Sequence, residues 1–96
     1  MLTYLVRLTI VIDRPTYEPN LPDHFAYLAA LKADGRLLLS GPVTDRTGGF
    51  VLLRADSPEQ AHELLRRDPL VARELVRYDL SEWRITNGDP NLIIPS

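Results

Sequence analysis

The chain contains no cysteine, which excludes disulfide bonds, thiol catalysis and metal sites with cysteine ligands. It also lacks any apolar run close to the ~20 residues that a helix needs to cross a bilayer. Its 13 acidic and 11 basic residues are mixed along the sequence, and the formal net charge is -2. Because the chain has no basic stretch that would attract phosphates, we expect neither nucleic acid nor a membrane as a partner.

Motifs for cofactors and metals are absent as well. The two histidines, His24 and His62, are not spaced as metal ligands, and the scattered acids add no pattern. There is no phosphate-binding glycine loop, no dinucleotide fingerprint and no serine in a nucleophile elbow. We therefore expect no metal and no cofactor.

The length of 96 residues suits one domain, which we expect to span residues 1–96 with a core at about 1–85 and a tail at 86–96. A chain of this size buries roughly 60–70% of its unfolded surface and is marginally stable alone. The apolar amino terminus contains Arg7 and no cleavage site follows it, so it reads as a strand and not as a signal peptide. The expected location is the cytoplasm.

Residue patterns predict four strands and two helices. The strands are expected at 2–12, 36–40, 50–54 and 75–85, and the helices at 21–33 and from 58 to the Asp68-Pro69 stop. In the first strand one face is fully apolar (Leu2, Tyr4, Val6, Leu8, Ile10), whereas the other is mixed. We expect loops at 13–20 and 43–49, a short turn at 70–74 and a turn at 87–90.

Helix boundaries carry local signals. Asn20 or Asp23 is expected to cap the first helix, a stripe of Phe25, Leu28 and Leu31 to be buried, and Gly35 to end it. Ser57 is the expected cap of the second helix, with Pro58 at its first position and Gln60 completing a capping box. Gly41-Pro42 is expected to break the second strand.

The resulting order, βαββαβ, predicts a ferredoxin-like α+β fold: a four-stranded antiparallel sheet with both helices on one face. The other sheet face is left bare, and its mixed residues need a cover. A second copy of the chain is the simplest cover, so we expect a homodimer.

The sequence resembles the YCII-like (YciI-related) family over about residues 1–85. The matching features are His24 before an amphipathic helix, Gly35-Arg36-Leu37-Leu38, Gly41-Pro42, Gly48-Gly49-Phe50, the start of the second helix at Ser57–Ala61, and Asp68-Pro69. The resemblance implies a dimeric α+β barrel with a histidine–aspartate pair, here His24 and Asp68, as the active site. Some relatives act on chlorinated hydroquinones, and the wider superfamily includes muconolactone isomerases. Two features differ from many relatives: Leu70 stands where an aromatic residue is common, and the tail is longer. The substrates of relatives therefore cannot be assigned to this chain.

Several candidate residues can also be explained by a purely structural role. His24 is either a general base or a surface histidine in a first turn, and Asp68 either orients its ring or only ends a helix. Arg7 is predicted to bind an anionic group or to pair across a dimer. Ser40 and Gly41 are predicted to let a ligand approach. Of the aromatic residues, Phe50 is our candidate for substrate contact, although Phe50, Tyr78 and Trp83 suit a core or interface better, and His62 is expected to be solvated.

These residues lead to two hypotheses of function. In the first, the protein is a small cofactor-independent enzyme, a lyase or an isomerase, in which the His24–Asp68 pair performs acid/base chemistry on a cyclic or phenolic compound. In the second, it is a non-catalytic small-molecule-binding or regulatory module whose cleft holds a small molecule. A small-molecule ligand is expected in both, and neither defines the substrate.

Overall fold

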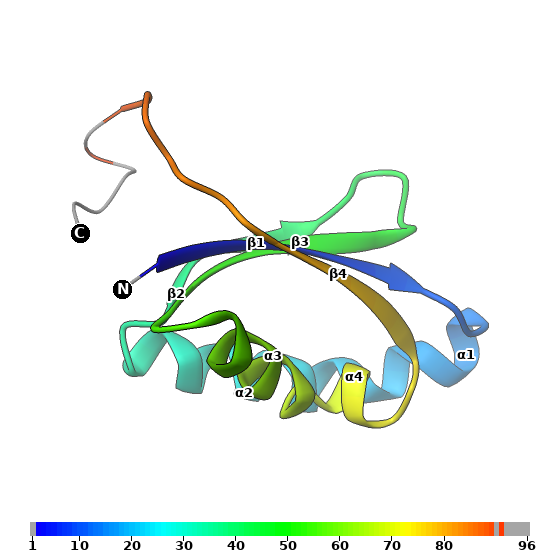
Figure 1. Cartoon of the computed structure of the whole chain (residues 1–96). Helices are drawn as coiled ribbons and strands as arrows, with labels where there is room; N and C mark the ends of the chain where they lie inside the picture. Colours follow the sequence, from blue (N-terminus) through cyan, green and yellow to red (C-terminus); the bar gives the residue numbers. More distant parts are fainter. Residues whose placement is uncertain (1, 90, 92–96) are drawn as a thin grey trace.

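The computed structural model describes residues 2–89 and 91, which form one sheet with helices on one side (Figure 1). The elements, in chain order, are β1 (Leu2–Ile10), α1 (Arg14–Tyr17), the 3-10 turn η1 (Glu18–Asn20), α2 (Leu21–Ala33), β2 (Leu37–Pro42), β3 (Gly48–Ala55), α3 (Pro58–Arg66), α4 (Pro69–Ala72) and β4 (Val76–Glu82).

The sheet has the strand order β2-β3-β1-β4, and each neighbouring pair is antiparallel. The two main helices, α2 and α3, cover one face of it, as Figure 1 shows. This is the ferredoxin-like α+β fold that the order of elements predicted. The hairpin loop between β2 and β3 and the segment after β4 rise on the opposite, open side.

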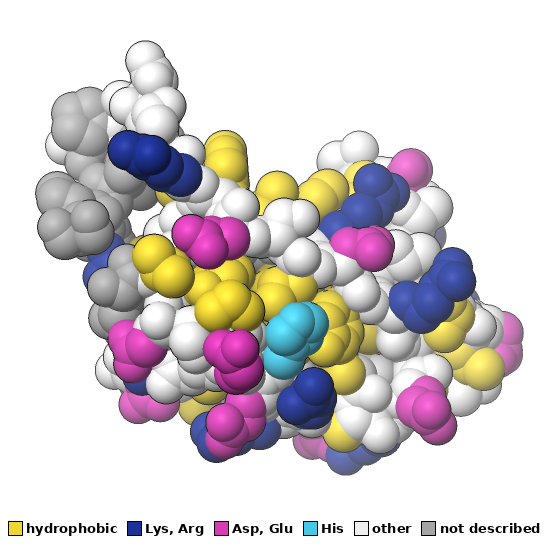
Figure 2. Space-filling view, in the orientation of Figure 1, with side chains coloured by type: hydrophobic (Ala, Val, Ile, Leu, Met, Phe, Trp, Pro, Cys, Tyr) yellow, Lys and Arg dark blue, Asp and Glu magenta, His cyan; other side chains and the backbone are white. Residues whose placement is uncertain are grey.

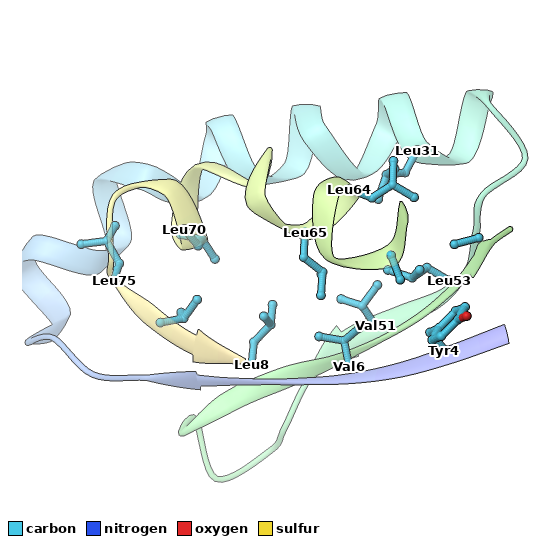
Figure 3. Packing of buried hydrophobic residues seen from close by; sticks show 13 residues of the cluster. Tyr4, Val6, Leu8, Leu31, Val51, Leu53, Leu64, Leu65, Leu70 and Leu75 are labelled. Atoms are coloured by element: carbon cyan, nitrogen blue, oxygen red, sulfur yellow. The ribbon is translucent and has the colours of Figure 1, made fainter. Parts of the chain in front are cut away.

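The core lies between the sheet and the helices, and β1 contributes every second residue to it. Tyr4, Val6 and Leu8 are at most 5% exposed, as the alternation in the sequence predicted, because successive side chains of a strand point to opposite faces. Figure 3 shows them packed against leucines of α2 and α3, among them Leu31 and Leu65. The core therefore holds both helices against the centre of the sheet.

The open face of the sheet keeps apolar side chains at its surface. Leu39 and Phe50 are 54% and 39% exposed, and Trp83, just after β4, is 47% exposed. In Figure 2 apolar side chains appear along this upper edge, whereas acidic and basic side chains are interspersed over the helix side. The mixed face predicted for the first strand is thus uncovered in the single chain.

Two predictions about connections are wrong. Of the predicted loop at 13–20, residues 14–20 form α1 and η1, because Pro15 and Pro19 lie at helix starts, where proline needs no N–H. Gly41-Pro42 does not break the second strand: β2 is an edge strand and tolerates proline through Pro42. β3 also starts earlier than predicted, at Gly48, where a Cβ atom would lie 1.8 Å from the Leu8 carbonyl oxygen.

Most helix-end signals are confirmed. Gly35 follows α2 with a φ of +73°, and the Ser57 hydroxyl accepts a hydrogen bond from the Gln60 amide at 3.1 Å. The Gln60 side chain, however, reaches the Asp56 amide and not that of Ser57. Asn20 does not cap α2 with its side chain, because η1 leads directly into the helix and Asn20 already has helical backbone angles.

The buried stripe of α2 differs from the predicted one. Phe25 is 59% exposed, and the residues of α2 that are fully buried are His24 and Leu31. His24, Leu28 and Leu31 have the i, i+4, i+7 spacing of one helix face. A histidine therefore occupies a position on the core-facing side of the helix.

Candidate active site

His24 lies in the first turns of α2 with its ring turned toward the interior. The residue is 8% exposed. A buried imidazole needs a polar partner, because leaving a buried hydrogen-bonding group unpaired costs about 1–3 kcal/mol. Because His24 lies on the apolar side of α2, its imidazole needs a hydrogen-bond partner from another element.

Asp68 supplies that acceptor from the junction of α3 and α4. Pro69 keeps the residue before it out of the helical region, and Asp68 accordingly has extended backbone angles and caps α4. Its Oδ1 atom accepts a hydrogen bond from the Leu70 amide at 2.9 Å. Both carboxylate oxygens lie 3.0 Å from Nδ1 of His24, and Asp68 is 1% exposed.

This geometry selects one tautomer of the imidazole. A carboxylate can only accept hydrogen bonds, so Nδ1 carries the proton and donates it to Asp68. Every hydrogen bond of the ring to the described residues goes through Nδ1, so in the neutral form of the ring the lone pair is on Nε2. The pair thus has the arrangement of an oriented base.

Several contacts hold the two halves of the pair together. Arg73, which follows α4, donates to Asn20 Oδ1 at 2.6 Å and to Asp23 Oδ2 at 2.9 Å, at the start of α2. On the other side the Tyr27 hydroxyl donates to the Leu64 carbonyl of α3 at 2.6 Å. These links connect α2 with α3 and α4 on both sides of the His24–Asp68 contact.

Asp68 also affects two nearby tyrosines. Burial raises the pKa of Tyr17, and the negative charge of Asp68 raises it further, although Arg14 acts in the opposite direction. Burial and the charge of Asp68 also raise the pKa of Tyr27. Both phenols therefore remain neutral hydrogen-bond donors at physiological pH.

His24 forms part of the wall of a cavity of about 630 Å³ between α2, the β2–β3 hairpin and α1. The volume lies within the usual range of small-molecule sites. The wall is mainly apolar, and its lining residues are Leu8, Ile10, Arg14, Tyr17, Leu21, His24, Phe25, Leu28, Ser40, Gly41, Pro42, Val43, Thr44, Arg46, Gly48, Gly49, Phe50 and Val51.

Three of the predicted substrate-binding residues line this cavity: Ser40, Gly41 and Phe50. No protein atom lies within 4 Å of where a Cβ atom of Gly41 would be, so its surroundings are open. Arg7 does not line the cavity; its guanidinium lies 5.6 Å from the centre of the Phe50 ring on the open face. The roles of these residues in binding stay predictions.

His62, which was expected to be solvated, is instead half-buried. Its Nδ1 atom lies 2.8 Å from the Tyr78 hydroxyl, and the two rings are in tilted contact. This prediction is wrong because α3 packs on the sheet with His62 facing β4. His62 is not among the residues that line the cavity with His24.

Among the cavity residues that sequence reasoning missed are Arg14, Tyr17 and Arg46. Arg14 and Tyr17 belong to α1, which was predicted as a loop, and Arg46 lies in the hairpin loop. No local pattern marks them as neighbours, because α1 and the hairpin are about thirty residues apart in the sequence and meet only in the fold. The signal available in the sequence was the presence of one arginine in each of the two connecting segments, α1 and the β2–β3 loop.

Other kinds of site find no support in residues 2–89 and 91. That part of the chain holds no cluster of three or more histidine, aspartate or glutamate side chains that could bind a metal ion. None of its helices is long and apolar enough to span a membrane.

The fold and its relatives define the class of the protein. Its sheet order and its layering of helices on one sheet face are those of a ferredoxin-like α+β protein. Residues 7–84 match the model of the YCII-related domain. The chain is also 38% identical over 85 residues to the uncharacterised protein YjpA of Bacillus subtilis (strain 168), which covers 88% of this chain and 98% of YjpA. The chain therefore belongs to the YCII-related family.

Two solved structures share the fold. One is the 5-chloro-2-hydroxyhydroquinone dehydrochlorinase of Burkholderia phenoliruptrix AC1100 in complex with 2,5-dihydroxybenzoquinone. Its TM-score is 0.74 at 24% identity, over 85% of this chain and 93% of that one. The other is a muconolactone isomerase, with a TM-score of 0.71 at 14% identity over 98% of this chain and 96% of that one. At these identities the likeness shows the fold alone.

Proposed function

We propose that the protein is a cofactor-independent enzyme that uses His24 as a general base on a small cyclic or phenolic compound. The observation that carries the proposal is the contact of His24 Nδ1 with both oxygens of the buried Asp68, in a ring that also lines a cavity. The two structural relatives are named as enzymes for small cyclic compounds, which supports small-molecule chemistry on this fold.

The chemistry follows from the tautomer of the ring. With Nδ1–H donated to Asp68, Nε2 takes a proton from an acidic C–H or O–H bond of the substrate, and Asp68 stabilises the imidazolium that forms. The electron pair of the broken bond moves into the substrate. It either expels a leaving group as an anion or accepts the proton back from Nε2 at another atom, which gives elimination or isomerisation respectively.

The surroundings of His24 suit such a step. Leu21, Leu28 and Phe25 line the cavity beside the histidine, and an apolar wall strengthens the electrostatic effect of the buried carboxylate. Tyr17 lines the same cavity, and its raised pKa keeps the proton on its hydroxyl, so we propose that this hydroxyl donates a hydrogen bond to a substrate oxygen.

A second function, binding without turnover, is favoured by one observation. Asp68 caps α4 by accepting a hydrogen bond from the Leu70 amide. This structural role can account for the buried carboxylate without any role in catalysis. In that case the cavity holds a small molecule, and the His24–Asp68 pair contributes only to the shape of the site.

Hydrogen exchange into a bound ligand separates the two functions. Aromatic diols and unsaturated lactones are first screened by thermal shift, because a ligand that binds only the native state raises the melting temperature. Compounds that bind are then incubated with the enzyme in D₂O, and NMR records deuterium incorporation or product. We expect His24→Gln to reduce the rate ~100- to 10,000-fold, the usual contribution of a placed base.

His62→Gln is the matched control, since it removes the other histidine, which lies outside the cavity lining. The control is expected to retain the exchange rate of the native protein. Equal rates in His24→Gln and the native protein refute the general base. Ligands that bind both proteins equally and never exchange support the binding module instead.

We also propose that the functional unit is a homodimer formed through the open sheet face. Leu39, Phe50 and Trp83 are exposed there, and a monomer rarely leaves such a set uncovered. Phe50 belongs both to this face and to the cavity lining, so a partner on the face would border the site.

A further inference from the structure

The ionisable lining residues named for this cavity include bases but no aspartate or glutamate. These bases are Arg14, Arg46 and His24. Asp68 lies behind His24 and is 1% exposed. A mainly apolar cavity therefore has two arginine residues in its wall and no acidic residue among its lining residues.

The two arginines form a defined pair. Arg14 of α1 donates through Nη2 to the main-chain oxygen of Arg46 at 3.1 Å, which fastens the hairpin loop to α1. Glu18 is the acid shared by both: its Oε1 atom lies 3.4 Å from Arg14 Nη1 and 4.0 Å from Arg46 Nη2. One carboxylate between two guanidiniums leaves the pair with a net positive charge.

Two further acids lie near α1 and the hairpin, and both have partners of their own. Asp13 accepts a hydrogen bond from the Thr16 hydroxyl at 2.8 Å. Asp45 accepts hydrogen bonds from the Thr47 amide at 3.0 Å and from the Thr47 hydroxyl at 2.6 Å. These bonds lower the pKa of Asp45 and direct its carboxylate toward Thr47. Asp45 therefore acts as part of the hairpin turn and is absent from the cavity lining.

The backbone at Arg46 adds an independent observation. Its φ is +68°, a left-handed conformation that glycine and asparagine adopt far more easily than arginine. Backbone strain of this kind concentrates at functional sites in proteins. Arginine at this position is thus unfavourable for the turn itself, which favours a role for its side chain.

We infer that Arg14 and Arg46 bind a carboxylate of the ligand, so that the cavity takes a small cyclic carboxylate. A guanidinium presents paired N–H donors that match the two oxygens of a carboxylate, and such charge-assisted bonds are stronger than neutral ones. The apolar wall then contacts the ring of the ligand. The inference rests on the proposed function, because the ring must also reach His24.

The test compares acids with their primary amides, which have nearly the same shape and no charge. Gentisate and salicylate, each paired with its amide, are titrated into the native protein by calorimetry at low salt. We expect each acid to bind at least ~10-fold more tightly than its amide, a difference of about 1.4 kcal/mol, and the preference to shrink as salt screens the charges.

Arg46→Asn is the decisive variant. Asparagine accepts the left-handed backbone, so the melting temperature should stay equal or rise while the preference for acid over amide falls toward one. Arg14→Gln should reduce the preference in the same way. Arg66→Gln is the matched control, because Arg66 is exposed on α3 and does not line the cavity; it should leave the preference unchanged.

Two results overturn the inference. The first is equal affinity of the native protein for acid and amide, or no measurable binding of any acid in the set. The second is an unchanged preference in Arg46→Asn. Because this titration measures binding without turnover, it fails or succeeds independently of the deuterium exchange that tests His24.

Discussion

The replacement Asp68→Asn tests the orientation of His24 without requiring a substrate. In the native structure Oδ1 of Asp68 accepts from the Leu70 amide, and both oxygens face Nδ1 of His24. Asparagine keeps the size and the cap if its oxygen stays at the Leu70 amide. Its amino group then takes the place of the other oxygen, 3.0 Å from Nδ1.

That exchange reverses the hydrogen bond. An amino group can only donate, so a proton on Nδ1 would face the amino hydrogens, although Oδ1 also lies 3.0 Å from Nδ1. We expect Nδ1 to become the acceptor and the ring proton to move to Nε2. Nε2, which holds the lone pair in the native tautomer, then carries a hydrogen. We therefore expect the variant to lose the base and to lose ~100- to 10,000-fold in exchange rate.

The stability cost follows from the bonds that change. A hydrogen bond to a charged group contributes about 1.5–3 kcal/mol and a neutral one about 0.5–1.5, so Asp68→Asn should destabilise by about 1–2 kcal/mol. Asp68→Ala removes the cap as well and leaves a buried imidazole unpaired. Its expected cost is about 3–5 kcal/mol, the range found when a buried pair loses one partner.

The assay is NMR of the ¹⁵N-labelled imidazoles, which distinguishes the Nδ1–H from the Nε2–H tautomer, together with urea unfolding. His62, whose Nδ1 contacts the Tyr78 hydroxyl, serves as an internal reference and should not change. An Nε2–H tautomer of His24 already present in the native protein would refute the reasoning. So would an unchanged tautomer in Asp68→Asn.

Four further predictions concern stability and assembly. Tyr4→Phe should stabilise by about 1 kcal/mol in thermal melts, because the buried Tyr4 hydroxyl has no partner among the described residues; a loss of stability would mean that it has one. Tyr27→Phe should instead destabilise by about 1 kcal/mol, because its hydroxyl bonds the Leu64 carbonyl. Burial and Asp68 raise the pKa of Tyr27 above its ordinary 10.0, so native stability should fall as the pH rises beyond that value, and urea midpoints of Tyr27→Phe should fall less steeply. Leu39→Asp, on the open face, should shift the proposed dimer to a monomer in sedimentation, whereas Ala30→Asp on α2 should not.

Local signals determined much of the fold. The alternation in the first strand, the Ser57 cap and the stop at Gly35 are all confirmed, because each depends on contacts within a few residues. The prediction failed where a neighbour in space overrode the local signal. Gly41-Pro42 stays in a strand because β2 is at the sheet edge, and Phe25 is exposed because His24 takes the buried side of α2.

The sequence alone also singled out His24 and Asp68, through the resemblance to the family and not through any local pattern. Only the tertiary structure decided that they touch, since they are 44 residues apart and meet where α2 packs beside the α3–α4 junction. The same holds for Arg14 and Arg46, which local patterns assign to unrelated connections. A hydrogen bond or a shared cavity between distant residues depends on how helices and strands pack, and that packing is a property of the whole chain.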